Sequence, residues 1–253
     1  MEVVFTNDNN VRIIVPFHSY SRLMAQRDNH EVLFRRIHSY LFQKQVIKGN
    51  VIDLGAWIGD NTVPWAKQTT AVIYAIDPSV KNCRYIQQVA AMNSVSNIKI
   101  IQKAISDKQE SLYTRDNLHH CSFVYNKAPE GFGRGVEAVS LDSLFSAKEI
   151  VDIGFIHLDV EGMEAVVVKG AEKLINDLRP LVTFEQHLEL DDYKGLSAEF
   201  TKKGYRVYMI NEVLLGCRPD CRNFIAFPSE KVTDTLLTDI HNHIGSVCLE
   251  PSL

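Results

Sequence analysis

The stretch that decides the fold is Val51-Ile52-Asp53-Leu54-Gly55-Ala56-Trp57-Ile58-Gly59-Asp60-Asn61-Thr62. A short apolar run around Asp53 predicts a strand, a glycine turn follows, and a helix is expected next. An open α/β sheet binds its ligand just beyond the carboxyl ends of its strands. We therefore expect Gly55 to allow close approach of backbone and ligand, and Gly59 to let the helix pack tightly. The glycine spacing lacks the Gly-x-Gly-x-x-Gly pattern that seats a dinucleotide pyrophosphate.

A second acidic residue follows one strand and one helix later. Ala71-Val72-Ile73-Tyr74-Ala75-Ile76 predicts a parallel strand buried on both faces. It runs into Asp77-Pro78-Ser79, where Pro78 ends the strand and Ser79 is expected to cap the next helix. An acid at this distance from the glycine turn is placed to accept both hydroxyls of a ribose. Asp77 therefore indicates a nucleoside ligand without identifying it, and a plain turn acid is the simpler alternative.

Composition is that of a soluble globular protein. Of the 253 residues, 45% are hydrophobic and 23% are charged, and the net charge is −4. The charge gives no sign of a nucleic-acid partner. No apolar run is long enough to span a bilayer, and the N-terminus lacks the pattern of a signal peptide, so a cytoplasmic location is expected. The oligomeric state is left open.

Alternating strand and helix patterns predict an α/β fold with a mostly parallel sheet and helices on both faces. We expect one domain in four parts. These are an N-terminal hairpin (residues 3–15) and helix (30–46) within residues 1–48, a cofactor-binding half at 49–106, an insertion or lid at 107–150, and a substrate-side half at 151–253. The clearest helical pattern covers residues 163–176.

Two later strands also end in carboxylates. Phe155-Ile156-His157-Leu158 leads into Asp159-Val160-Glu161-Gly162, and Leu181-Val182-Thr183-Phe184 leads into Glu185-Gln186-His187. With Asp53 and Asp77, these acids are expected along one edge of the sheet, where a cationic ligand, a metal ion or helix N-termini would offset their repulsion. Alternation along a strand points the side chains of Glu185 and His187 the same way.

At this point the chain resembles the FkbM-type S-adenosylmethionine-dependent methyltransferases, over about residues 45–190. The matching segments, in order, are Val51 to Thr62, Ile76-Asp77-Pro78-Ser79, Asn93, Ala104 to Asp107, Ser140-Leu141-Asp142-Ser143-Leu144, Leu158-Asp159-Val160-Glu161-Gly162, Lys169-Gly170-Ala171-Glu172 and Glu185-Gln186-His187. The resemblance implies a class I methyltransferase (Rossmann-like) sheet of about seven strands with the last one antiparallel. It also implies O-methylation, commonly of sugar or polyketide-type hydroxyls. Trp57 and His157 depart from the family pattern.

The resemblance implies the roles of individual residues. The donor S-adenosylmethionine would be held by Asp53, Gly55, Ala56, Trp57, Gly59, Asn61, Thr62, Asp77, Pro78, Ser79, Ala104, Ile105, Ser106 and Asp159. Asp77 would bind the ribose, and the segment from Ala104 to Ser106 would border the adenine. The methyl group and its acceptor would face Asp159, Glu161, Glu185 and His187.

The acceptor hydroxyl needs a base or a metal ion, and three arrangements are open. His187 removes the proton with help from Glu185, Asp159 does so instead, or Mg²⁺ bound by Asp159 and Glu185 polarises the hydroxyl. A structural role for His187, or for Glu161 as an acceptor for the backbone around Gly162, is the alternative. We expect a carbohydrate, glycan or glycolipid precursor as acceptor, with a polyketide-like or other small molecule as the second choice.

Other functions are weighed against this one. A non-catalytic S-adenosylmethionine-fold module would have no use for the carboxylates, and an NAD-dependent dehydrogenase would need the absent dinucleotide glycines. No Asn/Asp-Pro-Pro-aromatic element of an amino-methylating nucleic-acid enzyme is present. The cysteines and histidines near the C-terminus match no closed zinc pattern and read as scattered reduced residues: Cys217, Cys221, His241, His243 and Cys248.

Overall fold

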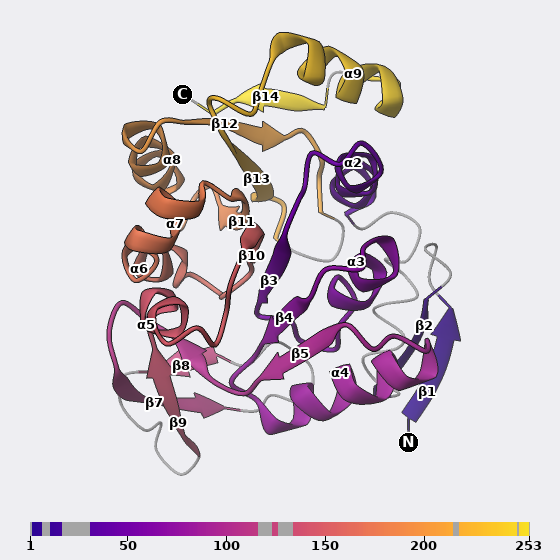
Figure 1. Ribbon diagram of the computed structural model, residues 1–253, viewed down its shortest axis with the longest axis vertical. Helices are drawn as coiled ribbons and strands as arrows, with labels where there is room; N and C mark the ends of the chain where they lie inside the picture. The colour runs from indigo at the N-terminus through magenta and orange to yellow at the C-terminus, as the bar shows by residue number, and fades with distance from the viewer. Residues whose placement is uncertain are drawn as a thin grey trace.

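The structure is a computed structural model that describes residues 2–6, 11–16, 31–115, 123–125, 134–214, 218–246 and 248–252. Its main sheet, counted over these residues, has eight strands in the order β14-β12-β13-β11-β10-β3-β4-β5 (Figure 1). Their bounds are β3 (Asn50–Leu54), β4 (Ile73–Ile76), β5 (Ile98–Ile101), β10 (Ile153–Leu158), β11 (Leu181–His187), β12 (Tyr205–Ile210), β13 (Cys221–Pro228) and β14 (Leu249–Pro251).

Strands β3, β4, β5, β10 and β11 are parallel, and β13 runs antiparallel to both of its neighbours, β11 and β12. The expected α/β architecture is confirmed. The eighth strand is β14, a short edge strand that pairs antiparallel with β12 and that no sequence pattern indicated.

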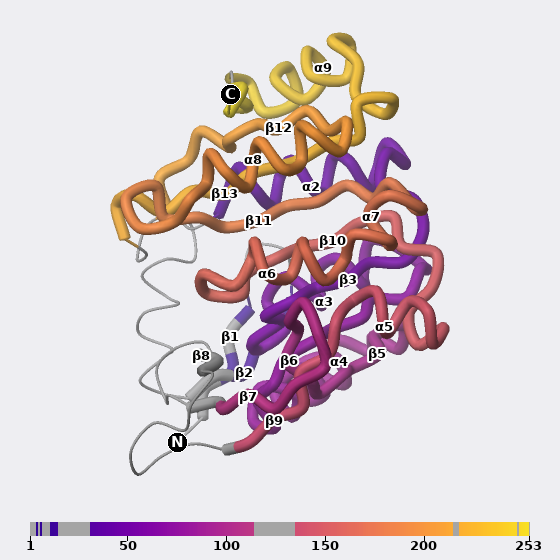
Figure 2. Tube along the Cα trace, turned by 90° about the vertical axis from the view of Figure 1, so that its left-hand side faces the viewer, coloured from indigo at the N-terminus to yellow at the C-terminus, as the bar shows by residue number. Residues whose placement is uncertain are grey.

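Helices cover both faces of this sheet, as the nearly uninterrupted apolar strands require. One face carries α2 (Val32–Gln43), α3 (Thr62–Gln68), α4 (Val80–Met92) and α9 (Asp234–Ile244), and the other carries α5 (Leu141–Ser146), α6 (Glu164–Lys169), α7 (Glu172–Leu178) and α8 (Tyr193–Lys202). Alternation along β3 sends Val51 into the first layer and Ile52 into the second. Figure 2 shows α9 at the far end of the molecule from the hairpin strands β1 (Glu2–Thr6) and β2 (Arg12–Pro16).

The predicted helix at 163–176 is two helices, α6 and α7, separated at Gly170. A Cβ on Gly170 would lie 2.3 Å from the carbonyl oxygen of Ser106, so the chain passes close to the neighbouring segment there. The carboxylate of Asp142 accepts hydrogen bonds from the backbone N–H groups of Lys173 (2.9 Å) and Leu174 (2.8 Å), in the first turn of α7. This cap from another segment compensates the break in the helix, which periodicity alone does not reveal.

The chain between β5 and α5 forms a second, four-stranded sheet in the order β6-β9-β7-β8. Its strands are β6 (Ala104–Ile105), β7 (Glu110–Arg115), β8 (Phe123–Tyr125) and β9 (Arg134–Val139). Helix α5 lies inside the predicted insertion at 107–150, yet its buried Leu141 and Leu144 pack on the main sheet. The layered fold therefore resumes earlier than the sequence indicated.

The N-terminal hairpin is present as expected, and β1 pairs antiparallel with β2. It is anchored to the end of α4, where Asn93 accepts a hydrogen bond from the Arg12 backbone N–H (2.9 Å) and donates one to the Arg12 carbonyl (2.7 Å). Val11 and Ile13 are buried against α3 and α4. The hairpin therefore packs on helices α3 and α4, which lie beside the glycine turn.

Candidate functional site

A cavity opens at the carboxyl ends of β3, β4 and β10, the edge at which an open α/β sheet binds its ligand. It is lined by Leu54, Gly55, Ile76, Asp77, Pro78, Lys103, Ala104, Ile105, Asp159, Val160, Glu161 and Met163. Gly55, Asp77, Pro78, Ala104, Ile105, Asp159 and Glu161 were singled out in the sequence. Leu54 and Ile76 were missed although they are the last strand residues before the turn and before Asp77. For Lys103 and Met163 no sequence signal was available.

The two glycines of the turn differ in what surrounds them. Both have positive φ, +78° at Gly55 and +83° at Gly59. A Cβ on Gly55 would lie 1.8 Å from the backbone oxygen of Asp159, so this glycine lets two strand ends meet, and it also lines the cavity. A Cβ on Gly59 would meet Val63 and Ile86 side-chain atoms at 3.5 and 3.6 Å, which is ordinary contact. Gly59 is therefore required by its backbone conformation and not by tight helix packing.

The Asp77 carboxylate fastens the glycine turn to the start of α4. It accepts hydrogen bonds from the backbone N–H groups of Trp57 (3.0 Å) and Ser79 (2.8 Å) and from the side chain of Asn82 (3.1 Å to each oxygen). Ser79 caps α4 as predicted, accepting from the Asn82 backbone N–H at 3.3 Å. These donors fix the Asp77 carboxylate where it lines the cavity. Asn82 is a supporting residue that sequence reasoning missed.

Several predicted donor-binding residues are not part of the cavity lining. The Asp53 carboxylate is buried on the α3 side and accepts a hydrogen bond from the Thr62 hydroxyl. Burial raises the pKa of Asp53 to about 7. Ala56 packs on Ala75 and Ile86, and the Ser106 hydroxyl donates to Glu110 at 2.5 Å. Trp57, Gly59, Asn61, Thr62 and Ser79 are likewise outside the lining.

The Asp159–Gly162 loop places two carboxylates in the cavity and is held by a third. Burial, and then the nearby charges of Glu185 and Glu161, raise the pKa of Asp159 well above its usual range. Glu164 is 2% exposed and accepts hydrogen bonds from the Val160 N–H (3.1 Å), the Gly162 N–H (3.4 Å) and the Gln186 side chain (3.0 Å). The backbone around Gly162 is thus held by Glu164 and not by Glu161, which lines the cavity.

Burial also raises the pKa of Glu164, to about 7. The carboxyl lies beneath the loop that carries Asp159 and Glu161, so its hydrogen bonds determine where those two side chains stand. Sequence reasoning missed Glu164 because an acid in the first turn of a helix has an ordinary explanation there.

Glu185 and His187 point the same way from β11, as expected, toward the α2 side of the sheet. They are not in the cavity lining, although Glu185 is close enough to Asp159 to influence its charge. The partner of His187 is Asp191, whose Oδ2 accepts the His187 backbone N–H at 2.6 Å and lies 3.2 Å from the ring Nδ1. The expected support from Glu185 is therefore supplemented by an acid in the following turn, which the sequence analysis did not consider.

His157, the other departure from the family pattern, does not reach the acidic edge. It is 2% exposed, its Nδ1 lies 3.0 Å from the Thr183 hydroxyl, and its ring packs against Phe34 and Trp65. Burial lowers its pKa to about 4, so it is neutral at physiological pH. Alternation along β10 directs His157 into the core beneath α2 and α3, away from the acidic edge.

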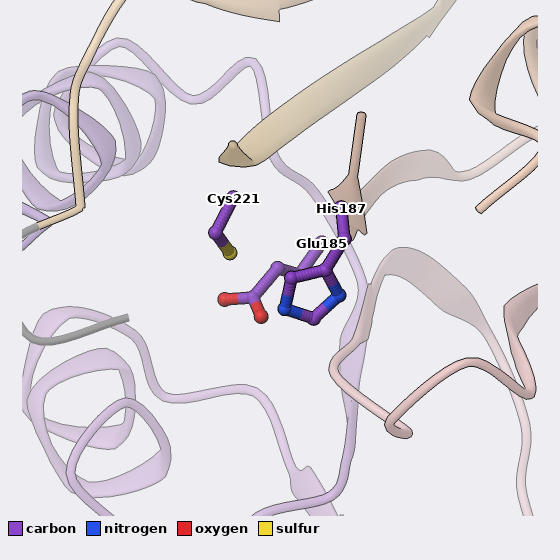
Figure 3. A group of neighbouring side chains, drawn as sticks. All are labelled: Glu185, His187 and Cys221. Carbon is purple, nitrogen blue, oxygen red and sulfur yellow. The ribbon is translucent and has the colours of Figure 1, made fainter. Parts of the chain in front are cut away.

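Metal-ligating side chains come together in a different combination from either one suggested by the sequence. Within the described residues, the side chains of Glu185, His187 and Cys221 bring their ligand atoms within 4.8 Å of one another (Figure 3). Asp159, expected to bind Mg²⁺ with Glu185, is not in this group, and imidazole and thiol are not magnesium ligands. His241 instead accepts from the Leu249 N–H at 3.4 Å, His243 packs against the Tyr40 ring in a tilted arrangement, and Cys217 lies outside the described residues.

In the described parts of the chain, no helix combines the length and the apolar character that crossing a bilayer requires. The cavity brings the carboxylates of Asp77, Asp159 and Glu161 together with apolar walls at the carboxyl edge of the sheet.

Comparison with known proteins agrees with this geometry. The family model described as the methyltransferase FkbM domain matches residues 53–207. No curated protein matches the chain. Among solved structures, the methyltransferase FkbM from Methylobacillus flagellatus KT is similar with a TM-score of 0.52 and 17% identity, over 70% of this chain and 43% of that one. This chain thus spans less than half the length of that protein.

Two further solved structures are more distant. The precorrin-6y C5,15-methyltransferase from Geobacter metallireducens GS-15 has a TM-score of 0.46 and 10% identity, over 76% of this chain and 86% of that one. Trm5b from Pyrococcus abyssi has a TM-score of 0.47 and 15% identity, over 89% of this chain and 54% of that one.

Proposed function

The chain belongs to the FkbM methyltransferase family, and on this premise we propose that it transfers a methyl group from S-adenosylmethionine to a hydroxyl of a carbohydrate or of a glycan or glycolipid precursor. The observation that carries the proposal is the cavity at the ends of β3, β4 and β10, which joins a fixed Asp77 carboxylate to two further carboxylates, Asp159 and Glu161. A polyketide-like hydroxyl is the alternative acceptor.

The cavity suits each part of the donor. Apolar walls from Ile76, Ile105 and Met163 fit an adenine ring, and Asp77 is positioned to accept the ribose hydroxyls. The donor supplies a methyl group already activated by a positively charged sulfur, so much of the rate can come from positioning. Asp159 and Glu161 would attract that charge and align the sulfur with the acceptor.

A base must remove the proton of the acceptor hydroxyl. We assign this role to Asp159 rather than to His187 because only the Asp159 carboxylate, of these two candidates, lines the cavity. His187 is the second candidate, since Asp191 holds its Nδ1 and leaves the other ring nitrogen to accept a proton. Glu185 lies beside both and would favour a positive charge on either the imidazole or the donor. Glu164 would serve as a positioning residue, because its hydrogen bonds hold the loop that carries Asp159.

Donor binding is tested first, by thermal shift with S-adenosylmethionine, S-adenosylhomocysteine and NAD. A ligand at 100 times its Kd stabilises the folded protein by about 2.7 kcal/mol. We expect this from the first two ligands and not from NAD. Stabilisation by NAD alone would refute the donor assignment.

Methyl transfer is tested with isotopically labelled donor and a panel of sugars, with mass spectrometry to locate the new methyl ether. We expect Asp159→Asn to lower turnover on the order of 100-fold, while His187→Gln has a smaller effect. The reverse order would make His187 the base. Transfer only to non-sugar hydroxyls would reject a carbohydrate as the acceptor. Transfer to nitrogen or carbon would reject O-methylation.

A further inference from the structure

Three side chains that could bind a metal ion converge beside the cavity without being part of its lining. His187 at the end of β11 is paired directly with Cys221 at the start of β13, and Glu185 lies two residues earlier on the face of β11 that carries His187. Residues opposite each other on antiparallel strands bring their side chains together, and residues two apart on one strand share a face. The convergence therefore follows from the strand pairing at the adjoining ends of β11 and β13.

The orientation of the imidazole is the second observation. Its Nδ1 lies 3.2 Å from Asp191 Oδ2, which also accepts the His187 backbone N–H. Figure 3 shows the other ring nitrogen facing the Glu185 carboxylate, with Cys221 on the same side. Metal-binding histidines almost always donate their second ring N–H to a carboxylate or carbonyl, which fixes the tautomer and turns the lone pair toward the metal. Here Asp191 is placed to accept the Nδ1 proton of His187, which leaves the lone pair of Nε2 for the metal.

The three ligand atoms lie within 4.8 Å of one another. In a tetrahedral zinc site, bond lengths of about 2.3 Å to sulfur and 2.0 Å to nitrogen place ligand atoms about 3.5 Å apart. The group would therefore have to contract by at most little more than 1 Å to hold the ion. Asp159 and Glu161 lie near Glu185, so a bound cation would offset the repulsion among these carboxylates.

From this geometry we propose that Glu185, His187 and Cys221 bind a divalent transition-metal ion, with Zn²⁺ as the preferred ion, and that Asp191 positions His187 for it. Carboxylate, imidazole and thiolate together select Zn²⁺ over Mg²⁺ or Ca²⁺. Three protein ligands leave a fourth position open, as in catalytic rather than structural zinc sites.

One consequence rests on the proposed function. A metal ion on His187 would remove that residue as a base and leave Asp159 to accept the proton. An ion there lowers the pKa of a bound hydroxyl and so shares the work of deprotonation.

The test is a titration of chelator-treated, dialysed protein with Co²⁺ alone, followed by the near-ultraviolet absorption of a cobalt–thiolate bond. We expect saturation at one ion per chain and loss of the band when Zn²⁺ is added. Cys221→Ser should abolish the band, while Cys248→Ser, at another buried cysteine, should keep it. Asp191→Asn should keep the band but weaken binding about 10–100-fold.

Absence of a saturable band in the folded protein, or a band that survives in Cys221→Ser, would overturn the proposal. If Cys221→Ser does not fold, as judged by circular dichroism, the decision passes to His187→Gln, which should shift the absorption and weaken Co²⁺ binding; an unchanged titration would reject the site. The readout involves no methyl transfer. A failed titration therefore leaves the proposed function untouched, and an inactive enzyme leaves the metal site untouched.

Discussion

Gly55→Ala and Gly59→Ala form a matched pair that tests how the cavity is built. Both glycines have positive φ, +78° and +83°, so alanine costs about 1–2 kcal/mol of folding free energy at either position. Only at Gly55 does the new Cβ also collide with backbone, 1.8 Å from the Asp159 oxygen. To reach even 3.0 Å, the ends of β3 and β10 must move apart by about 1.2 Å, a strain comparable to core overpacking at about 1–3 kcal/mol.

The functional difference between the two variants should exceed the difference in stability. Asp159 and Gly55 both line the cavity, so the displacement falls where donor and acceptor would be aligned. A misplacement of about 1 Å costs on the order of 100-fold in rate. We expect Gly55→Ala to lose about that factor in methyl transfer and to weaken S-adenosylmethionine binding, while Gly59→Ala keeps most of both.

Urea denaturation measures the first effect, and calorimetry with S-adenosylmethionine and single-turnover transfer measure the second. Equal loss of stability and of donor binding in the two variants would refute the reasoning, since it would mean that the close approach to Asp159 does not shape the cavity. Gly59→Ala supplies the internal control because its Cβ has room at 3.5 Å from the nearest atom.

Two further predictions concern stability. Glu164→Ala leaves the Val160 and Gly162 N–H groups and the Gln186 side chain without their acceptor, so the free energy of unfolding should fall by about 2–5 kcal/mol. Glu161→Ala in the cavity should change it by less than about 1 kcal/mol. Equal effects of the two variants in urea melts would contradict the assignment of Glu164 as the residue that holds the loop. His38 is fully buried, its Nδ1 lies 2.6 Å from the Phe34 carbonyl, and burial lowers its pKa from 6.5 to about 3. Below pH 6.5 His38 is therefore protonated in the unfolded chain but stays neutral in the folded protein, which lowers the stability of the folded state. This difference should account for about 2 kcal/mol of the stability lost between pH 7 and pH 5. His38→Leu should reduce that loss by the same amount in denaturant titrations at the two pH values, and the exposed His243→Leu should leave it unchanged; an unaltered pH slope in His38→Leu would show that the buried histidine is not the cause.

The sequence alone determined the order of strands and helices and the edge of the sheet that carries the site. Apolar runs of strand length that end in Asp53, Asp77 and Asp159, and the helical periodicities between them, are local signals. They suffice because a parallel sheet covered on both sides allows few other arrangements. Residues just after such strands must meet at the carboxyl edge, which is why Gly55, Asp77, Asp159 and Glu161 could be expected there, where they line the cavity.

Tertiary structure decided what the neighbours of each residue are. Three findings depend on which segments meet across the fold. Gly55 gives room to the Asp159 backbone, Glu164 and not Glu161 holds the loop, and His157 is buried beneath α2. The pairing of His187 with Cys221 depends on the register between β11 and β13, strands that are separated by a helix and another strand along the chain. The hydrophobic pattern fixes which face of each strand is buried, but it does not identify the residue opposite on a strand far along the chain, because a shift by two residues keeps every side chain on its face and changes every cross-strand neighbour.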